Sequence, residues 1–130
     1  MENKKKWLGI LVMVLVFGML IIGCIAVPAT QENNNVSLNG VWDRGDIVVT
    51  VSGNTGTVTQ IDPNYNRGSN LRVGSTQFRN ISRTSNLRWS AQHLFNNDSY
   101  GNITMTMSAD GRTLRIHFQG FPDDVYTRVQ

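Results

Sequence analysis

The stretch ITMTMSADGRTLRIHF, residues 103–118, decides the fold of this chain. Apolar residues occupy alternate positions on both sides of Asp110-Gly111. Alternation with a period of two is typical of a strand with one buried face, and Asp-Gly between two such runs is a strong hairpin signal. Residues 103–107 and 113–118 are therefore predicted to form two antiparallel strands joined by a tight turn.

Alternating apolar residues continue through the rest of the chain after Pro28. The connections between these runs are short, which favours antiparallel neighbours, and no run has helical spacing. We predict an all-β domain of about eight antiparallel strands in an up-and-down meander, closing into a small barrel because closure removes exposed sheet edges. The longest loop is expected over residues 62–74. The other strands are expected at residues 40–42, 47–51, 58–61, 78–82, 87–95 and 125–129.

The N-terminal segment has a different composition. Three lysines at residues 4–6 precede an apolar stretch over residues 7–22, which ends in Gly-Cys at Cys24. A basic region, an apolar region and a small residue before a cleavage point make up a secretory signal. The ending Ile-Ile-Gly-Cys resembles the lipobox of bacterial lipoproteins, in which a diacylglycerol is attached to the cysteine thiol and the chain is cut before it.

This resemblance implies a helical lipoprotein signal peptide over residues 1–23 and lipidation of Cys24. Residues 24–37 are polar and rich in Asn after Pro28, which predicts a lipidated flexible tether, and residues 38–130 would form the β-domain. The protein is then expected in the bacterial cell envelope, anchored to a membrane with its domain outside the cytoplasm. The alternative is an uncleaved anchor, because about 20 apolar residues can span a bilayer. Both alternatives export the same domain.

Charge and cysteine content exclude several classes of function. All three lysines lie in the signal, and the chain from Cys24 onward has nine arginines against eight acidic residues. These arginines are spread out, whereas a nucleic-acid interface needs a concentrated basic patch, so nucleic acid is not an expected partner. A single cysteine also excludes an internal disulfide and a zinc site built on several thiolates.

Both ends of the expected barrel resemble the calycin group, which includes the lipocalins and fatty-acid-binding proteins. The first strand begins Gly40-Val41-Trp42 and the last carries Tyr126-Thr127-Arg128. In calycins the first strand bears Gly-x-Trp, and an arginine near the end of the barrel packs across that tryptophan. The resemblance implies that Trp42 and Arg128 form this closing pair, that Gly40 permits a tight approach, and that a small apolar ligand is bound.

Period two places several large side chains on the inner face, onto which any small-molecule site is expected to open. The possible ligand-facing residues are Trp89, His93, Met105 and Met107, and Ile116 and Phe118 share their face. His93 is either a hydrogen-bonded core residue or a polar contact for a ligand. The acidic residues Asp43, Asp46, Asp123 and Asp124 have a spacing that indicates turns.

No cofactor, no metal site and no catalytic residue is predicted from this pattern, so the protein is not expected to be an enzyme. The favoured function is a non-enzymatic interaction module of the envelope that takes part in assembly, inhibition or adhesion. The alternative is lipocalin-like carriage of a small apolar ligand. The two differ in cavity volume, because an eight-stranded barrel can be filled by its own side chains or can hold one small ligand.

Overall fold

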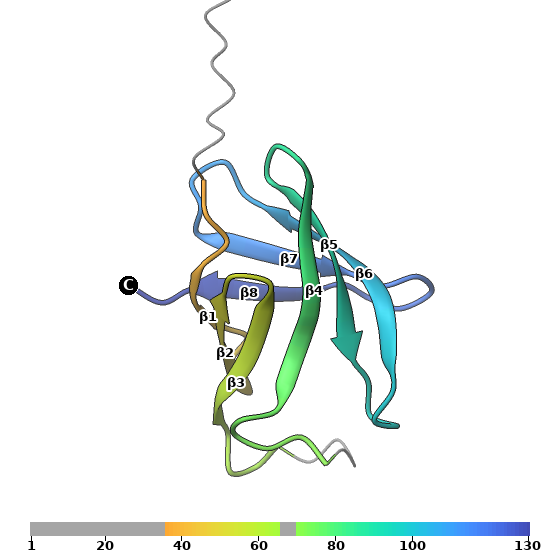
Figure 1. Cartoon of the computed structure of the whole chain (residues 1–130). Coiled ribbons are helices and arrows are strands. Elements are labelled where there is room, and N and C mark those ends of the chain that lie inside the picture. Colours follow the sequence, from red (N-terminus) through yellow and green to blue (C-terminus); the bar gives the residue numbers. More distant parts are fainter. Residues whose placement is uncertain (1–35, 66–69) are drawn as a thin grey trace, which may run out of the picture. The chain divides into compact units, whose positions relative to one another are not determined.

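The computed structural model describes residues 36–65 and 70–130, and Cys24 lies outside these residues. Eight β-strands follow one another along the chain (Figure 1). Within the described part, no helix is long and apolar enough to cross a membrane. The strands are β1 (Gly40–Asp43), β2 (Ile47–Ser52), β3 (Thr55–Ile61), β4 (Thr76–Ser85), β5 (Arg88–Leu94), β6 (Tyr100–Met107), β7 (Thr113–His117) and β8 (Asp124–Arg128).

Every strand pairs with its neighbour in sequence, and β8 returns to pair with β1, so the sheet closes into a barrel. All these pairs are antiparallel. The predicted all-β meander that closes into a barrel is thereby confirmed. The hairpin at Asp110-Gly111 joins β6 to β7, with Met105 opposite Ile116. Gly111 has a φ of +72°, a backbone conformation that glycine adopts without steric cost.

Strand β4 differs from its prediction, which covered only residues 78–82. It is ten residues long, and its pairing with β5 shifts register twice, between Arg79 and Ser82 and between Arg83 and Ser85. Asn80 has a φ of +52° at the first shift. Each bulge inserts an unpaired residue, so apolar residues do not alternate regularly along β4. The strand therefore lacks the sequence pattern by which its full length could be predicted.

The inner face of the barrel carries the hydrophobic core. Trp89 and Met107 are at most 5% exposed, and Met105 and Ile116 are fully buried. Burial of such side chains stabilises the fold by about 1.5–3 kcal/mol each. The buried hydrophobic residues are Leu38, Trp42, Ile47, Val49, Val51, Val58, Phe78, Trp89, Ala91, Ile103, Met105, Met107, Leu114, Ile116, Phe118 and Tyr126.

Successive connections of an up-and-down barrel alternate between its two ends. The connections β1–β2, β3–β4, β5–β6 and β7–β8 lie at one end, which we call the loop end. The opposite end, the closed end, carries the other three hairpins and residues 36–39, since Asn39 accepts a hydrogen bond from the backbone of Gly53 in the β2–β3 hairpin. In Figure 1 the β4–β5 hairpin at the closed end is at the top, and the β3–β4 and β5–β6 loops are at the bottom.

At the closed end, the guanidinium of Arg128 lies 4.3 Å from the ring centroid of Trp42. Arg128 also donates hydrogen bonds to three backbone carbonyls, those of Gly111 (2.8 Å), Asn39 (2.8 Å) and Ser37 (2.9 Å). These bonds join β8 to the chain before β1 and to the β6–β7 hairpin. The structure thus brings Trp42 and Arg128 together where the two ends of the sheet meet.

Gly40 makes this arrangement possible, as the Gly-x-Trp resemblance implies. A Cβ at Gly40 would lie 2.5 Å from Nη1 of Arg128, and Gly40 has a φ of +142°. Trp42, which is fully buried, donates from Nε1 to the carbonyl of Leu38 at 3.0 Å. The closed end is therefore fixed by one arginine, one tryptophan and the glycine that leaves room for both.

We expect Arg128→Lys to lower the free energy of unfolding by about 2–3 kcal/mol, because an ammonium cannot reach all three carbonyls and lacks a planar face for Trp42. Urea unfolding followed by tryptophan fluorescence measures this change. Arg88→Lys is the matched control, since Arg88 is exposed on the outer face of β5. Equal stability of the two variants would contradict the closing role of Arg128.

Candidate ligand-binding pocket

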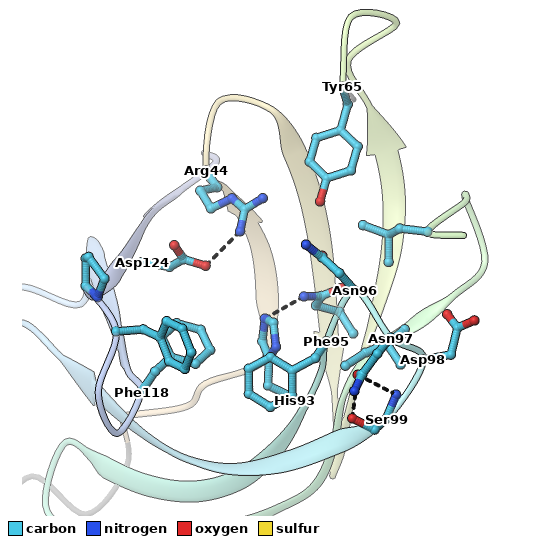
Figure 2. Close-up of a pocket in the computed structure, with 15 residues that line it drawn as sticks. Arg44, Tyr65, His93, Phe95, Asn96, Asn97, Asp98, Ser99, Phe118 and Asp124 are labelled. Atoms are coloured by element: carbon cyan, nitrogen blue, oxygen red, sulfur yellow. Dashed lines mark hydrogen bonds and ion pairs between the residues drawn. The ribbon is translucent and has the colours of Figure 1, made fainter. Parts of the chain in front are cut away.

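A pocket with a volume of about 700 Å³ lies at the loop end of the barrel. This volume falls within the range of small-molecule sites, roughly 300–1,000 Å³. The pocket is lined by residues from all four loop-end connections and the strands beside them (Figure 2). They are Arg44, Tyr65, Leu71, Gln77, His93, Leu94, Phe95, Asn96, Asn97, Asp98, Ser99, Phe118, Phe121, Pro122 and Asp124.

Three rings pack against one another in the wall of the pocket. His93 meets Phe118 edge to face at a centroid distance of 4.8 Å and lies 5.3 Å from Phe95. Phe95 and Phe118 are 6.0 Å apart. A Cβ at Gly101 on β6 would collide with the ring of Phe95, so glycine there allows the ring to lie against the strand. Figure 2 shows these rings grouped on one side of the pocket.

The β5–β6 loop forms a rim that its own hydrogen bonds hold in place. Asn97 Oδ1 accepts from the backbone N–H of Ser99 at 3.2 Å and from its hydroxyl at 2.5 Å. The backbone N–H of Phe95 donates to the carbonyl of Ser99 at 2.8 Å, and that of Asp98 donates to the carbonyl of Phe95 at 3.0 Å. Local bonds of this kind fix the loop before any ligand arrives, which reduces the entropy lost on binding.

Arg44 is held between two carboxylates at the loop end. Its Nε and Nη2 donate to the two oxygens of Asp46 at 2.6 and 2.8 Å, and its Nη1 donates to Asp124 Oδ2 at 2.7 Å. The Arg44 side chain is only 9% exposed. Burial lowers the pKa of Arg44, but its bond to Asp46 and the nearby negative charges outweigh burial and raise it, so Arg44 is always charged.

Below this ion pair lies Tyr126, whose ring centroid is 5.8 Å from the Arg44 guanidinium. Burial raises the pKa of Tyr126 well above its usual value, so its hydroxyl is neutral. Arg44, Asp46 and Asp124 together carry one positive and two negative charges. Asp98 on the rim adds a further carboxylate. Among the described residues that line the pocket, the two carboxylates of Asp98 and Asp124 therefore outnumber the single guanidinium of Arg44.

Gln77 and His93 form a buried polar pair, 3% and 6% exposed. Gln77 Nε2 and His93 Nε2 are 2.6 Å apart. Among the described residues, Gln77 Oε1 and His93 Nδ1 have no hydrogen-bond partner. Burial lowers the pKa of His93 to about 4, with a smaller lowering effect from Arg44 and an opposing effect from Asp124. The imidazole is therefore neutral at pH 7.

Of the four residues predicted to face a ligand, only His93 lines this pocket. Trp89, Met105 and Met107 are buried on the same face but nearer the closed end. Trp89 is near the start of β5, whereas His93 is near its end, and Met107 Sδ lies 3.7 Å from Arg128 Nη2. Period two identifies the inner face, but the position along the strand decides which half of the barrel a side chain occupies.

Sequence reasoning missed the Arg44 and Gln77 contacts. Asp46 and Asp124 do lie at the margins of turns, but their carboxylates hold Arg44. A usable signal exists: in an up-and-down meander the β1–β2 and β7–β8 connections share an end, so Arg44 and Asp124 could be placed together from strand order. Gln77 had no such signal, because Gln77 and Phe78 are consecutive buried residues, against the alternation of a regular strand.

Within residues 36–65 and 70–130, no group of three His, Cys, Asp or Glu side chains could hold a metal ion. His117, the other histidine, is on the outer face of β7 with its side chain 65% exposed. Its Nδ1 lies 2.8 Å from Asp123 Oδ1. This contact, together with Arg115, lowers the pKa of the Asp123 carboxyl. These groups do not line the pocket.

We expect the neutral, buried His93 to make the fold sensitive to acid. In the unfolded chain His93 has the ordinary histidine pKa of about 6.5, whereas burial lowers the pKa of folded His93 to about 4. Between these two values the unfolded chain binds a proton and the folded protein does not, so the free energy of unfolding decreases as the pH falls. The loss from His93 should reach about 2 kcal/mol between roughly pH 7 and pH 5. Urea unfolding at the two pH values measures it.

His93→Gln should reduce this pH-dependent loss, whereas His117→Gln, at an exposed site, should retain it. The comparison uses the change in stability with pH, so any constant cost of the substitution cancels. Identical pH dependence in wild type and His93→Gln would show that folding does not lower the pKa of His93.

Comparison with known proteins adds no evidence on function. No protein-family model matches the chain, and neither a curated protein nor a solved structure matches it. The function is therefore argued from the geometry and chemistry of the pocket.

Proposed function

We propose that this protein is a non-enzymatic binding protein that holds a small amphipathic ligand in the pocket at the loop end of its barrel. The observation that carries the proposal is the pocket itself, about 700 Å³ in volume, walled by the packed rings of His93, Phe95 and Phe118. Aromatic walls with a few polar groups are typical of sites for small organic molecules. The local hydrogen bonds of the rim support binding without a large rearrangement.

The sequence indicates two functions, an interaction module and lipocalin-like carriage of a small apolar ligand. The presence of the pocket favours carriage of a ligand. A barrel filled throughout by its side chains would have favoured the interaction module. Here Met105, Leu114 and Trp42 fill the closed half, whereas the loop half encloses a cavity. The eight-stranded closed barrel and the packing of Arg128 on Trp42 also support the resemblance to calycins.

An interaction with another envelope protein is the second candidate, and one observation favours it. Phe121, beside the pocket in the β7–β8 connection, is 69% exposed, and Val73 in the β3–β4 loop is 62% exposed. Apolar side chains on exposed loops can contact a protein partner. Both residues lie in loop-end connections, so a protein partner would approach the same end of the barrel as a ligand.

For the location of the protein, the proposal follows the sequence. Lipidation at Cys24 would anchor the exported domain to a membrane of the bacterial cell envelope, and an uncleaved anchor over the same apolar stretch is the alternative. The chain enters the barrel through residues 36–39 at the closed end. The described part of the chain thus begins at the end of the barrel opposite the pocket.

We expect the full-length protein in lipid nanodiscs to bind the neutral fluorophore N-phenylnaphthylamine with a saturable rise in emission above that of empty nanodiscs. Asn96→Trp should abolish this rise, because Asn96 is exposed and lines the pocket, so an indole there would block the mouth. Asn54→Trp, on the β2–β3 turn at the closed end, is the matched control and should bind as wild type does. Equal signals from the protein and from empty nanodiscs, or from the two variants, would contradict the proposal.

Cys24→Ala should abolish incorporation of a labelled fatty acid and block cleavage of the signal, because the thiol is the only possible site for a thioether-linked lipid in this chain. Labelling in cells followed by gel electrophoresis measures both effects. Ala26→Ser, two residues beyond the cysteine, is the control and should be labelled. Label in the Cys24→Ala protein would refute lipidation at this site. Absence of label in the wild type would also refute lipidation and would favour the uncleaved anchor.

A further inference from the structure

The buried pair Gln77–His93 presents one unpaired donor and one unpaired acceptor. Two nitrogens are 2.6 Å apart, and the amide nitrogen of Gln77 can only donate, so His93 Nε2 accepts and the ring proton is on Nδ1. Nδ1–H is then a donor and Gln77 Oε1 an acceptor, and neither has a partner among the described residues. Rotating the Gln77 amide exchanges the two roles but leaves the same count, one donor and one acceptor.

Unpaired polar atoms in such buried side chains are rare and costly. Gln77 and His93 are each more than nine-tenths buried, and both line the pocket. A molecule in the pocket would provide the missing partners once these side chains turn their unpaired atoms toward it. A group that both donates and accepts, such as an amide, a lactam or a hydroxyl, has the chemistry to pair with either atom. A carboxylate offers acceptors only, and an ammonium offers donors only.

The charge of Arg44 is already compensated by carboxylates, although Nη1 and Nη2 each have a second N–H. Each of its three nitrogens already donates to a carboxylate of Asp46 or Asp124, at 2.6 to 2.8 Å. Among the described residues that line the pocket, Arg44 is positively charged and Asp98 and Asp124 are negatively charged. A carboxylate ligand would lose its hydration on entering the pocket, and the carboxylates of Asp98 and Asp124 would repel it. Both effects lower its affinity relative to a neutral ligand.

We infer that the pocket selects neutral, ring-bearing molecules with an amide or hydroxyl group, which hydrogen-bonds to Gln77 and His93, and that it rejects carboxylates. This inference rests on the proposed function and states the chemical class of its ligand. The apolar part of the ligand would contact the rings of Phe95 and Phe118, which are packed with His93 in the pocket wall. Recognition then comes from one polar pair set in an aromatic wall.

Three ligands of matched shape test this selection: naphthamide, naphthoate and methylnaphthalene, each substituted at the same ring position. Calorimetric titration of the full-length protein in nanodiscs, with empty nanodiscs as the reference, gives their affinities. We expect naphthamide to bind about tenfold or more tightly than either of the others, because a site built around hydrogen bonds discriminates strongly against analogues that cannot form them. Naphthoate binding as tightly as naphthamide, or methylnaphthalene doing so, would overturn the inference.

Removing the polar pair tests its role directly. The double variant Gln77→Met, His93→Phe should bind naphthamide and methylnaphthalene with similar affinity, and Gln60→Met, at an exposed position on β3, should keep the preference of wild type. A double variant that still prefers naphthamide about tenfold would overturn the assignment. The three-ligand comparison on the wild type needs no altered protein, so the inference remains testable even if the double variant does not fold.

The results also separate the inference from the proposed function. If N-phenylnaphthylamine and all three naphthalenes fail to bind, the pocket is not a ligand site and both statements are wrong. If N-phenylnaphthylamine binds and is displaced best by naphthoate, the protein is a binding protein, but the ligand class inferred here is wrong.

Discussion

The junction between β1 and β8 is the constraint on which the rest of the structure depends. Two residue pairs are in register between these strands, Trp42 with Arg128 and Asp43 with Thr127, and the N–H of Val129 donates to the carbonyl of Val41 just beyond them. Without this junction the meander would be an open sheet with two exposed edges. Side chains reinforce the junction at both ends. Arg128 bonds to backbone carbonyls before β1 at the closed end, and Arg44 bonds to Asp124 of β8 at the loop end.

The interior of the closed barrel has two halves that differ in how densely side chains fill them. Eight strands enclose a space that side chains can just fill, and at the closed half they do so, with Trp42, Met105 and Leu114 fully buried. Toward the loop end the aromatic rings pack against the wall, and a cavity remains. The polar pair Gln77–His93 lies within this half, where the dense packing of apolar side chains gives way to a site that a small molecule can enter.

How much could be predicted from the sequence differs between fold and site. The fold follows from alternation and turn residues, which act locally, so the strands and their antiparallel order were predictable. Strand β4 was not fully predictable, because its two bulges break the alternation on which the prediction depends. The site could be predicted only in part. His93 was recognised from its face. The Arg44–Asp124 ion pair joins residues 80 positions apart, so it could be inferred only after the strand order had been assigned. Gln77 could not be inferred, because it is buried out of phase with a regular strand.

Arg44 belongs to two structures at once, since it holds the β1–β8 junction together and also lines the pocket. Only two residue pairs are in register between β1 and β8, as between β3 and β4. Local opening of the barrel is therefore expected at these two places, and at the β1–β8 junction it would separate Arg44 from Asp124. Such opening would remove Asp124 from the pocket wall in the same event. A molecule held in the pocket would therefore slow amide hydrogen exchange in β8, even at residues that it does not contact. The exchange rate of β8 would then report whether the pocket is occupied.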